Sequence, residues 1–440
     1  MVTDMSGHDP GPAGGETLDF LTVVRRSGVL ADRALRKVRV KVEGGVYPKA
    51  PIALAERLVR DGVLTRYQAE RLLRNKAHGL VIDRYVILEP LGEGAMARVY
   101  KAHHRLMGRV VAIKVIAPRY ASRARSVARF QREMRLIGRL DHPHIIRAYD
   151  ADQVDSAFFL VMEYAGGQSL DRVLQARGPL PHAEVVDYAA QAALGLAHAH
   201  RHGVIHRDIK PSNLLLTDDR QIKVLDLGLG TLIDANEQTS FATAAGHAVG
   251  TIDFMSPEQA CGGDVDGRSD CFGLGCTMYF LLTGRHPFPG DTALERLVRR
   301  LKGPPVPITE YRPDLPSAVV QVLEKLLARR PEDRFQTAAE AAEGLRALLL
   351  SDRPGAPDGP PAPTPPGRPA PSPGHAAPPE APSGSSDRPP PSAPSNGVLS
   401  DRAPVHSLIS LAEHSPRIVL ATLLAVLLAA FAAGFILGRW

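Results

Sequence analysis

The sequence predicts an α+β protein that combines short strands with helices. The clearest strand is Val110–Ile116, an apolar run of the kind that a sheet buries on both faces. Helices are predicted over Val127–Leu140 and over Phe272–Leu282, and the second is apolar enough to be a buried core helix. Further strand-like runs are Tyr85–Leu88, Val99–Ala102, Phe158–Val161 and Ile222–Leu225.

One charged loop contains three chemically distinct side chains at fixed offsets. It reads His206-Arg207-Asp208-Ile209-Lys210-Pro211-Ser212-Asn213. Asp208 could accept the proton of an attacking hydroxyl, Lys210 could neutralise charge on a moving phosphoryl group, and Asn213 could hold Mg²⁺. The combination predicts phosphoryl transfer from a nucleotide held by a metal ion. The alternative is a solvated charged loop. It is disfavoured because three functionally distinct polar residues occur together at this spacing.

A glycine-containing turn lies upstream, between two predicted strands. It reads Leu91-Gly92-Glu93-Gly94-Ala95-Met96-Ala97-Arg98-Val99. Glycines in a hairpin let the backbone close over phosphates, because no Cβ stands in the way. By itself such a turn is more often an ordinary hairpin.

Single charged residues mark two further positions. Lys114 lies inside the predicted strand Val110–Ile116, where an ammonium group is costly to bury without a partner. Glu133, in the helix-like stretch that follows, is the candidate partner. Asp226 comes directly after the strand that ends at Leu225, and with Asn213 and phosphate oxygens it would complete an oxygen ligand set for Mg²⁺. Glu258 and Arg334 are predicted to form a structural pair.

In this order, the motifs resemble a eukaryotic-type protein kinase domain, and in particular the bacterial Hanks-type serine/threonine kinases. The resemblance covers residues from about Arg84 to Leu350 and implies a bilobal protein-kinase fold. It implies that Asp208 and Lys210 are catalytic, and that Lys210 selects serine or threonine acceptors. It implies ATP as cofactor, with Mg²⁺ on Asn213 and Asp226 and Mn²⁺ as an alternative ion.

The same resemblance implies a nucleotide site. Lys114 would hold the α and β phosphates, Glu133 would orient Lys114, and Met162-Glu163-Tyr164-Ala165 would be the hinge that meets the adenine. The implied nucleotide-binding residues are Leu91, Gly92, Glu93, Gly94, Ala95, Met96, Ala97, Arg98, Val99, Ala112, Lys114, Glu133, Met162, Glu163 and Ala165.

Two departures from the family pattern bear on activity. Ala97 replaces the third glycine of the nucleotide turn, and Leu227 replaces the phenylalanine that often follows the metal-binding aspartate. Because the lysine, both metal ligands and the base are retained, an active enzyme is expected. The alternative is a catalytically weak pseudokinase that acts as a membrane-tethered scaffold.

Regulation is expected in the segment that follows Asp226. By the resemblance, Arg207 beside the catalytic base is the partner for a phosphate there. Phosphorylation at Thr239, Ser240 or Thr243 would then order the segment through a charge-assisted pair. The alternative is a flexible loop that simply contains hydroxyls. Protein substrates are the expected partners, and a dimer would allow autophosphorylation in trans.

The C-terminal region predicts a tether and an anchor. About a third of residues 351–400 are proline, so a disordered linker is expected over 351–417. Ile418–Leu437 has no charged residue, and as a helix it would span about 30 Å, the thickness of the bilayer core. A transmembrane helix followed by a short tail, 438–440, is therefore favoured over a buried core helix. The N-terminus shows no signal peptide, which predicts a single-pass protein of the cell's inner or plasma membrane with a cytoplasmic kinase domain.

The first 83 residues predict a small helical module of unknown function. Arg26-Ser27-Gly28-Val29-Leu30 recurs as Arg60-Asp61-Gly62-Val63-Leu64, offset by 34 positions. Thr65 and Gln68 form a capping box at the start of a predicted helix through Leu73. Two copies are too few for a solenoid.

Composition adds general limits. A chain of 440 residues is long enough for two or three domains, and its net charge of +6 is modest. No aromatic-studded basic patch or reading motif is present, so nucleic acid is not an expected partner. Cys261, Cys271 and Cys276 lack metal-ligand spacing and are expected to be reduced thiols in buried apolar positions.

Overall fold

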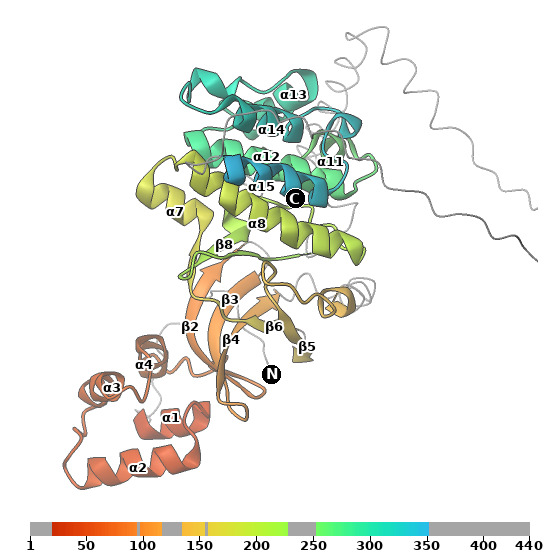
Figure 1. The fold of residues 1–440 in the computed structure, drawn as a ribbon. Coiled ribbons are helices and arrows are strands. Elements are labelled where there is room, and N and C mark those ends of the chain that lie inside the picture. The colour runs from red at the N-terminus through yellow and green to blue at the C-terminus, as the bar shows by residue number, and fades with distance from the viewer. Residues whose placement is uncertain (1–19, 95–96, 117–133, 155–156, 228–251, 352–440) are drawn as a thin grey trace, which may run out of the picture. The chain divides into compact units, whose positions relative to one another are not determined.

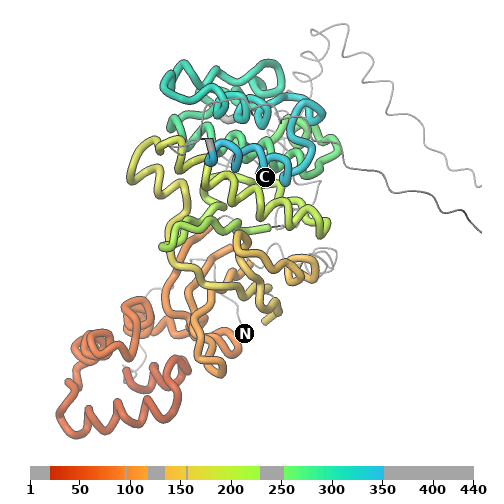
Figure 2. Tube along the Cα trace, in the orientation of Figure 1, coloured from red at the N-terminus to blue at the C-terminus, as the bar shows by residue number. Residues whose placement is uncertain are grey.

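The computed structural model describes residues 20–94, 97–116, 134–154, 157–227 and 252–351. Figure 2 follows the chain through these ranges. The predicted linker, the predicted membrane span Ile418–Leu437 and the predicted phosphorylation sites Thr239, Ser240 and Thr243 lie outside them. Within the described residues, no helix is both long and apolar enough to cross a membrane.

An antiparallel sheet of six strands forms the first lobe of the predicted kinase region (Figure 1). Its spatial order is β1 (Val81–Ile82), β2 (Tyr85–Glu93), β3 (Ala97–His104), β4 (Arg109–Ile116), β6 (Ala157–Glu163) and β5 (Ala148–Val154). Side chains alternate across β4, so Val111, Ile113 and Val115 join the apolar cluster on one face. Ala112 and Ile116 join the cluster on the other face, and the alternation places Lys114 on their side. The predicted strands in this region are confirmed.

Helices make up most of the second lobe. They are α7 (Leu170–Arg177), α8 (His182–Arg201), α11 (Pro257–Cys261), α12 (Gly267–Thr283), α13 (Ala293–Lys302), α14 (Ser317–Leu326) and α15 (Ala338–Ser351). A small sheet accompanies them, with strands β7 (Gly167–Ser169), β8 (Leu214–Thr217) and β9 (Ile222–Val224) in that order. Helices α8, α12 and α15 pack together around one large apolar core (Figure 1). Helix α12 contains the predicted core helix, and Phe272, Met278 and Leu282 in it are fully buried.

The N-terminal module is helical, as predicted. Its helices are α1 (Phe20–Ser27), α2 (Asp32–Glu43), α3 (Pro51–Arg60) and α4 (Arg66–Leu73), and they share one apolar core. The sequence repeat is a structural repeat, because Gly28 (φ 66°) and Gly62 (φ 67°) each turn the chain between two helices in the left-handed region. The predicted capping box of Thr65 and Gln68 is present at the start of α4.

The cysteine prediction needs one correction. Cys271 and Cys276 are buried in α12, and burial raises the pKa of each thiol to about 12, so both are unreactive. Cys261, by contrast, is exposed. It is the last residue of the short helix α11, next to the left-handed Gly262 at the C-cap, where the chain leaves the core.

Four histidine rings pack against one another between the start of β5 and the end of α8. The His142 ring lies 5.1 Å from that of His198 and 5.4 Å from that of His144, and the His198 and His202 rings are 4.5 Å apart. Burial and the neighbouring rings lower the pKa of His142 from 6.5 to about 4. In the described part of the chain, no group of three or more His, Cys, Asp or Glu residues could hold a metal ion.

This cluster predicts a loss of stability in mild acid. Because the folded protein resists protonation of His142, the unfolded chain takes up the proton first as the pH falls below 6.5. The stability that this lowered pKa contributes is therefore fully present above pH 6.5 and declines as the pH falls toward 4. His142→Asn keeps an acceptor for the His144 N–H and should reduce the fall in the urea-unfolding midpoint between pH 7 and pH 5. As a control, His78→Asn changes an exposed histidine, and its urea-unfolding midpoint should fall between pH 7 and pH 5 as much as that of the wild type. An equally large fall in His142→Asn would rule out the histidine cluster as the cause.

Candidate active site

A buried carboxylate on α12 holds the backbone of the loop His206–Asn213. Asp270 is 1% exposed, and its oxygens accept hydrogen bonds from the backbone N–H groups of His206 (2.9 Å) and Arg207 (2.7 Å). The His200 Nε2 atom lies 2.7 Å from Asp270 Oδ2. Burial opposes ionisation of Asp270, but the hydrogen bond and charge of His200 outweigh it and lower the pKa of the carboxyl.

Asp270 was not predicted from the sequence. A usable signal was present, because Asp270 adjoins the apolar run Phe272–Leu282 in the same way that Lys114 interrupts its strand. A charged group at the edge of a buried helix needs a partner. The partner could not be named from the sequence, since it is the backbone of a loop more than sixty positions away.

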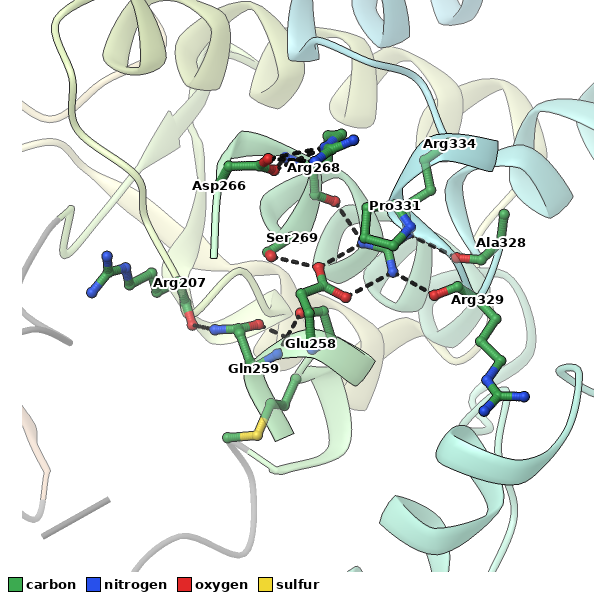
Figure 3. Close-up of polar contacts among 12 residues, drawn as sticks. Arg207, Glu258, Gln259, Asp266, Arg268, Ser269, Ala328, Arg329, Pro331 and Arg334 are labelled. Atoms are coloured by element: carbon green, nitrogen blue, oxygen red, sulfur yellow. Dashed lines mark hydrogen bonds and ion pairs between the residues drawn. The ribbon is translucent and has the colours of Figure 1, made fainter. Parts of the chain in front are cut away.

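Two residues of the site adopt left-handed backbone conformations, which are uncommon outside glycine. They are Arg207 (φ 67°) and Asp226 (φ 59°). Arg207 is fastened on both sides, since its N–H donates to Asp270 and its carbonyl accepts a 2.8 Å hydrogen bond from Gln259 Nε2 (Figure 3). Such conformations cost about 1–3 kcal/mol and persist where the surroundings fix them. The loop is therefore preorganised.

Asp208 has two oxygens in different environments. Its Oδ2 atom lies 2.8 Å from Lys210 Nζ and accepts a 3.0 Å hydrogen bond from Asn213 Nδ2. Its Oδ1 atom is buried and has no hydrogen-bond partner among the described residues. Asp208 is also one of the residues that line a small hollow, together with Phe254, Met255 and Gly273. One oxygen thus fixes the carboxylate while the other is available to accept a proton.

Backbone contacts link the segment that contains Asn213 to the segment that contains Asp226. The N–H of Leu225 donates to the Asn213 carbonyl (2.9 Å), and the His206 ring contacts the Leu225 carbonyl (2.7 Å). Asn213 directs its amide nitrogen to the Asp208 carbonyl oxygen (2.7 Å), so its amide oxygen is the atom left for a cation. An amide oxygen and a carboxylate are ligands that Mg²⁺ accepts, and the donor set fits this ion.

Lys114 pairs with Asp226. The distance from Nζ to Oδ1 is 2.7 Å, and the two side chains are 13% and 35% exposed. Burial opposes ionisation of Asp226, but the ammonium of Lys114 outweighs it and lowers the pKa of the carboxyl. The predicted partner, Glu133, lies outside the described residues, so the Lys114–Glu133 pair stays a prediction. Strand β4 therefore places the Lys114 ammonium beside Asp226, one of the predicted Mg²⁺ ligands.

The predicted nucleotide turn is a hairpin of β2 and β3. Gly92 lies opposite Val99 and Glu93 opposite Arg98, and the N–H of Gly94 donates to the Ala97 carbonyl. An ion pair of 2.7 Å joins Glu93 and Arg98, so these side chains hold the hairpin. Ala95 and Met96 lie outside the described residues. A Cβ at Gly92 would meet nothing within 4 Å, so space is open beside the backbone at this position.

An apolar surface lies under the hairpin. Ala112 of β4 lies opposite Met162 of β6, and both join a cluster against which Leu91 and Val99 pack. An apolar surface of this kind suits an adenine ring. The Glu163 carboxylate instead bonds Lys223 (2.9 Å), and the Glu163 N–H donates to the Arg147 carbonyl (2.9 Å). Ala165 follows two positions later, at the end of the predicted hinge.

Glu258 and Arg334 form the predicted structural pair. Two hydrogen bonds of 2.7 and 2.9 Å join them, and the Arg334 side chain is fully buried (Figure 3). The same guanidinium donates to the carbonyls of Ala328, Arg268 and Arg329, and Ser269 Oγ donates to Glu258. Helix α11 is thereby tied to α12.

A second buried arginine was not predicted. Arg300 of α13 is 1% exposed and donates to the carbonyls of Ile252, Asp253 and Met255 at 2.6–2.7 Å. Arg296, one turn earlier, binds the Asp253 carboxylate through two hydrogen bonds. Helix α13 therefore fixes the segment that lines the hollow beside Asp208. Its sequence resembles an ordinary basic amphipathic helix, so the inward orientation of the arginines could not be read from it.

Comparison with known proteins defines the class. A family profile described as "Protein kinase domain" matches residues 85–344, and the chain belongs to this family. It is 35% identical over 273 residues to the serine/threonine-protein kinase PrkC of Bacillus subtilis, covering 62% of this chain and 42% of that protein. It is 37% identical over 272 residues to the serine/threonine-protein kinase pkn3 of Myxococcus xanthus, covering 60% and 50%. The chain thus matches half or less of the length of these relatives.

Solved structures are also similar. The kinase domain of Mycobacterium tuberculosis PknI aligns with 30% identity and a TM-score of 0.49, covering 61% of this chain and 98% of that one.

Proposed function

We propose that this chain is an ATP-dependent kinase that phosphorylates serine and threonine hydroxyls of proteins. The observation that carries the proposal is that the two carboxylate oxygens of Asp208 have different surroundings. Lys210 and Asn213 hold Oδ2, while Oδ1 has no hydrogen-bond partner within the described residues and is the oxygen left to accept a proton. The relatives named above, described as serine/threonine-protein kinases, support the same acceptor class.

The residues act mainly by charge and position. Asp208 would accept the acceptor proton as the oxygen attacks phosphorus, and Lys210 beside it would stabilise charge on the transferred group. Lys114 would neutralise phosphate oxygens, and its contact with Asp226 keeps it at the edge of the metal site. Bound Mg²⁺ would be held by Asn213 and Asp226 and would neutralise charge on the phosphates.

Phosphate transfer from labelled ATP tests the proposal directly. With Mg²⁺ and a generic basic protein, we expect label on that protein or on the chain itself, and EDTA should abolish it. ATP binding without any transfer would instead favour the scaffold interpretation.

We also propose that Ile418–Leu437 anchors the protein in the inner or plasma membrane with its kinase domain in the cytoplasm. Support comes from the sequence alone, through the length and apolarity of this segment. Deletion of 418–437 should move the protein from the carbonate-resistant membrane fraction to the soluble fraction. Retention of the deleted form on membranes would contradict the anchor.

For regulation, we propose autophosphorylation in trans at Thr239, Ser240 or Thr243, read by Arg207. Arg207 is exposed, and its guanidinium makes no hydrogen bond or ion pair within the described ranges. Mixing wild-type protein with the inactive Asp208→Asn chain should place phosphate on the mutant at one of these residues. Active wild-type protein that lacks phosphate there would overturn this proposal.

A further inference from the structure

Strand β2 contains two bulges close to the nucleotide hairpin, one at Leu91, between Pro90 and Gly92, and one at Leu88. Ile87 lies opposite Ala102 in β3, whereas Glu89 lies opposite Lys101, so Leu88 is an extra residue on the β2 side. A bulge bends and twists its strand and leaves backbone groups outside the regular ladder. The direction in which β2 approaches Leu91 and Gly92 therefore depends on how the Leu88 bulge is held.

The N-terminal module supplies the partners of the Leu88 bulge. Gln68 Nε2 donates a 2.6 Å hydrogen bond to the Ile87 carbonyl, and Thr65 Oγ1 donates a 2.5 Å hydrogen bond to the Leu88 carbonyl. The same side chains form the capping box of α4, because Thr65 Oγ1 accepts from the Gln68 N–H and Gln68 Oε1 accepts from the Thr65 N–H. The Thr65 hydroxyl thus both donates and accepts, and both the oxygen and the nitrogen of the Gln68 amide are in use. Gln68 is only 3% exposed, so water does not replace it easily.

Apolar packing surrounds these hydrogen bonds. Val86 of β2 belongs to the core of the module, and Tyr67 packs against both that core and one face of the sheet. The N–H of Ile87 donates to the Leu80 carbonyl, and Arg105 at the end of β3 donates to the Gly28 carbonyl in the first repeat. Figure 1 shows α4 beside β2. The module is therefore packed against β2 and bonded to it, and is not joined to it only through the connecting chain.

We propose that the N-terminal module is a positioning element for the nucleotide hairpin, acting through Thr65 and Gln68 on the Leu88 bulge of β2. Gly92 lies four residues beyond Leu88 on the same strand, so a change at the bulge reaches the hairpin along one continuous element. The inference rests on the proposed function in assigning ATP to that hairpin. It gives the module a role in nucleotide affinity that needs no contact with the nucleotide.

The test uses the full chain with variants that keep the capping box. Gln68→Glu keeps a side-chain oxygen as the acceptor at this capping position, where Glu and Gln are both favoured. It removes the amide N–H that donates to the Ile87 carbonyl. Thr65→Asp keeps the N-cap acceptor but removes the hydroxyl donor to Leu88. Glu70→Gln is the matched control, since it makes the reverse exchange at an exposed position of the same helix.

We expect the KM for ATP to rise at least about fivefold in Gln68→Glu and Thr65→Asp, with kcat within about twofold of the wild type. Glu70→Gln should match the wild type in both constants. An unchanged KM for ATP in the folded variants, or a failure of both variants to fold, would overturn the proposal in favour of a structural role. If the wild type transfers no phosphate, the proposed function fails separately, and the Kd for ATP then decides this inference.

Discussion

Replacement of Asp208 by asparagine is expected to lower phosphate transfer by a factor of about 10²–10⁴, the usual contribution of a general base. Asparagine has nearly the same shape but cannot accept the proton of the attacking hydroxyl. Its amide group would also have to satisfy Lys210 and Asn213, which now donate toward Oδ2. The effect should fall on kcat, because Asp208 would act on the acceptor proton and does not belong to the apolar cluster under the hairpin.

Two further measurements make this result specific. The Kd for ATP should be unchanged within about twofold, which separates loss of the base from loss of the fold. Asp264→Asn, an exposed position in the same lobe, should retain full activity. Full transfer by Asp208→Asn would refute the assignment of the base and leave the kinase family membership intact.

The largest loss of stability is expected from Arg334→Met. Removal of one partner of a buried ion pair costs about 3–5 kcal/mol, because the other charge stays buried without compensation. Arg334 also satisfies three backbone carbonyls, so its loss leaves several acceptors unpaired. Urea unfolding should show this as a lower midpoint with an unchanged slope.

Two control variants test the Arg334 prediction: one also changes its partner Glu258, and the other breaks a more exposed ion pair. The double variant with Glu258→Gln should be no less stable than Arg334→Met alone, since the uncompensated carboxylate is then gone. Arg177→Met breaks a more exposed pair with Glu184 and should cost less. Equal losses in Arg334→Met and Arg177→Met would contradict the role of burial.

The pH dependence of this pair has a defined sign. Burial opposes ionisation of Glu258, but its hydrogen bond to Arg334 outweighs it and lowers the pKa of the carboxyl. Because the folded pKa lies below the unfolded one, the pair stabilises the protein at neutral pH. Its contribution is lost as the pH falls through the folded pKa.

The sequence was sufficient for the features encoded over short distances. The strands around Lys114, the loop from His206 to Asn213 and the capping box at Thr65 each follow from a local pattern of residue types, and the structure has them. The Glu258–Arg334 pair was also predicted, although its members lie 76 positions apart.

Contacts between distant segments account for what the sequence did not reveal. The partner of Asp270, the inward-facing Arg300 and the Lys114–Asp226 pair all depend on how elements pack, and no periodicity indicates them. The hydrogen bonds of Thr65 and Gln68 to β2 are of the same kind. The capping box explains those two residues completely from the local sequence, so nothing there suggested a second set of partners.

The Asp270 contact has a consequence for how the protein forms. Its hydrogen bonds to Arg207 and His206 span 63 and 64 positions of the chain. Closing a loop of this length is slow compared with forming local helices and hairpins. During synthesis, the loop His206–Asn213 therefore cannot acquire its final backbone before α12 has left the ribosome and packed on α8. Until then the backbone next to Asp208 lacks this support, so the candidate active site is assembled late in folding.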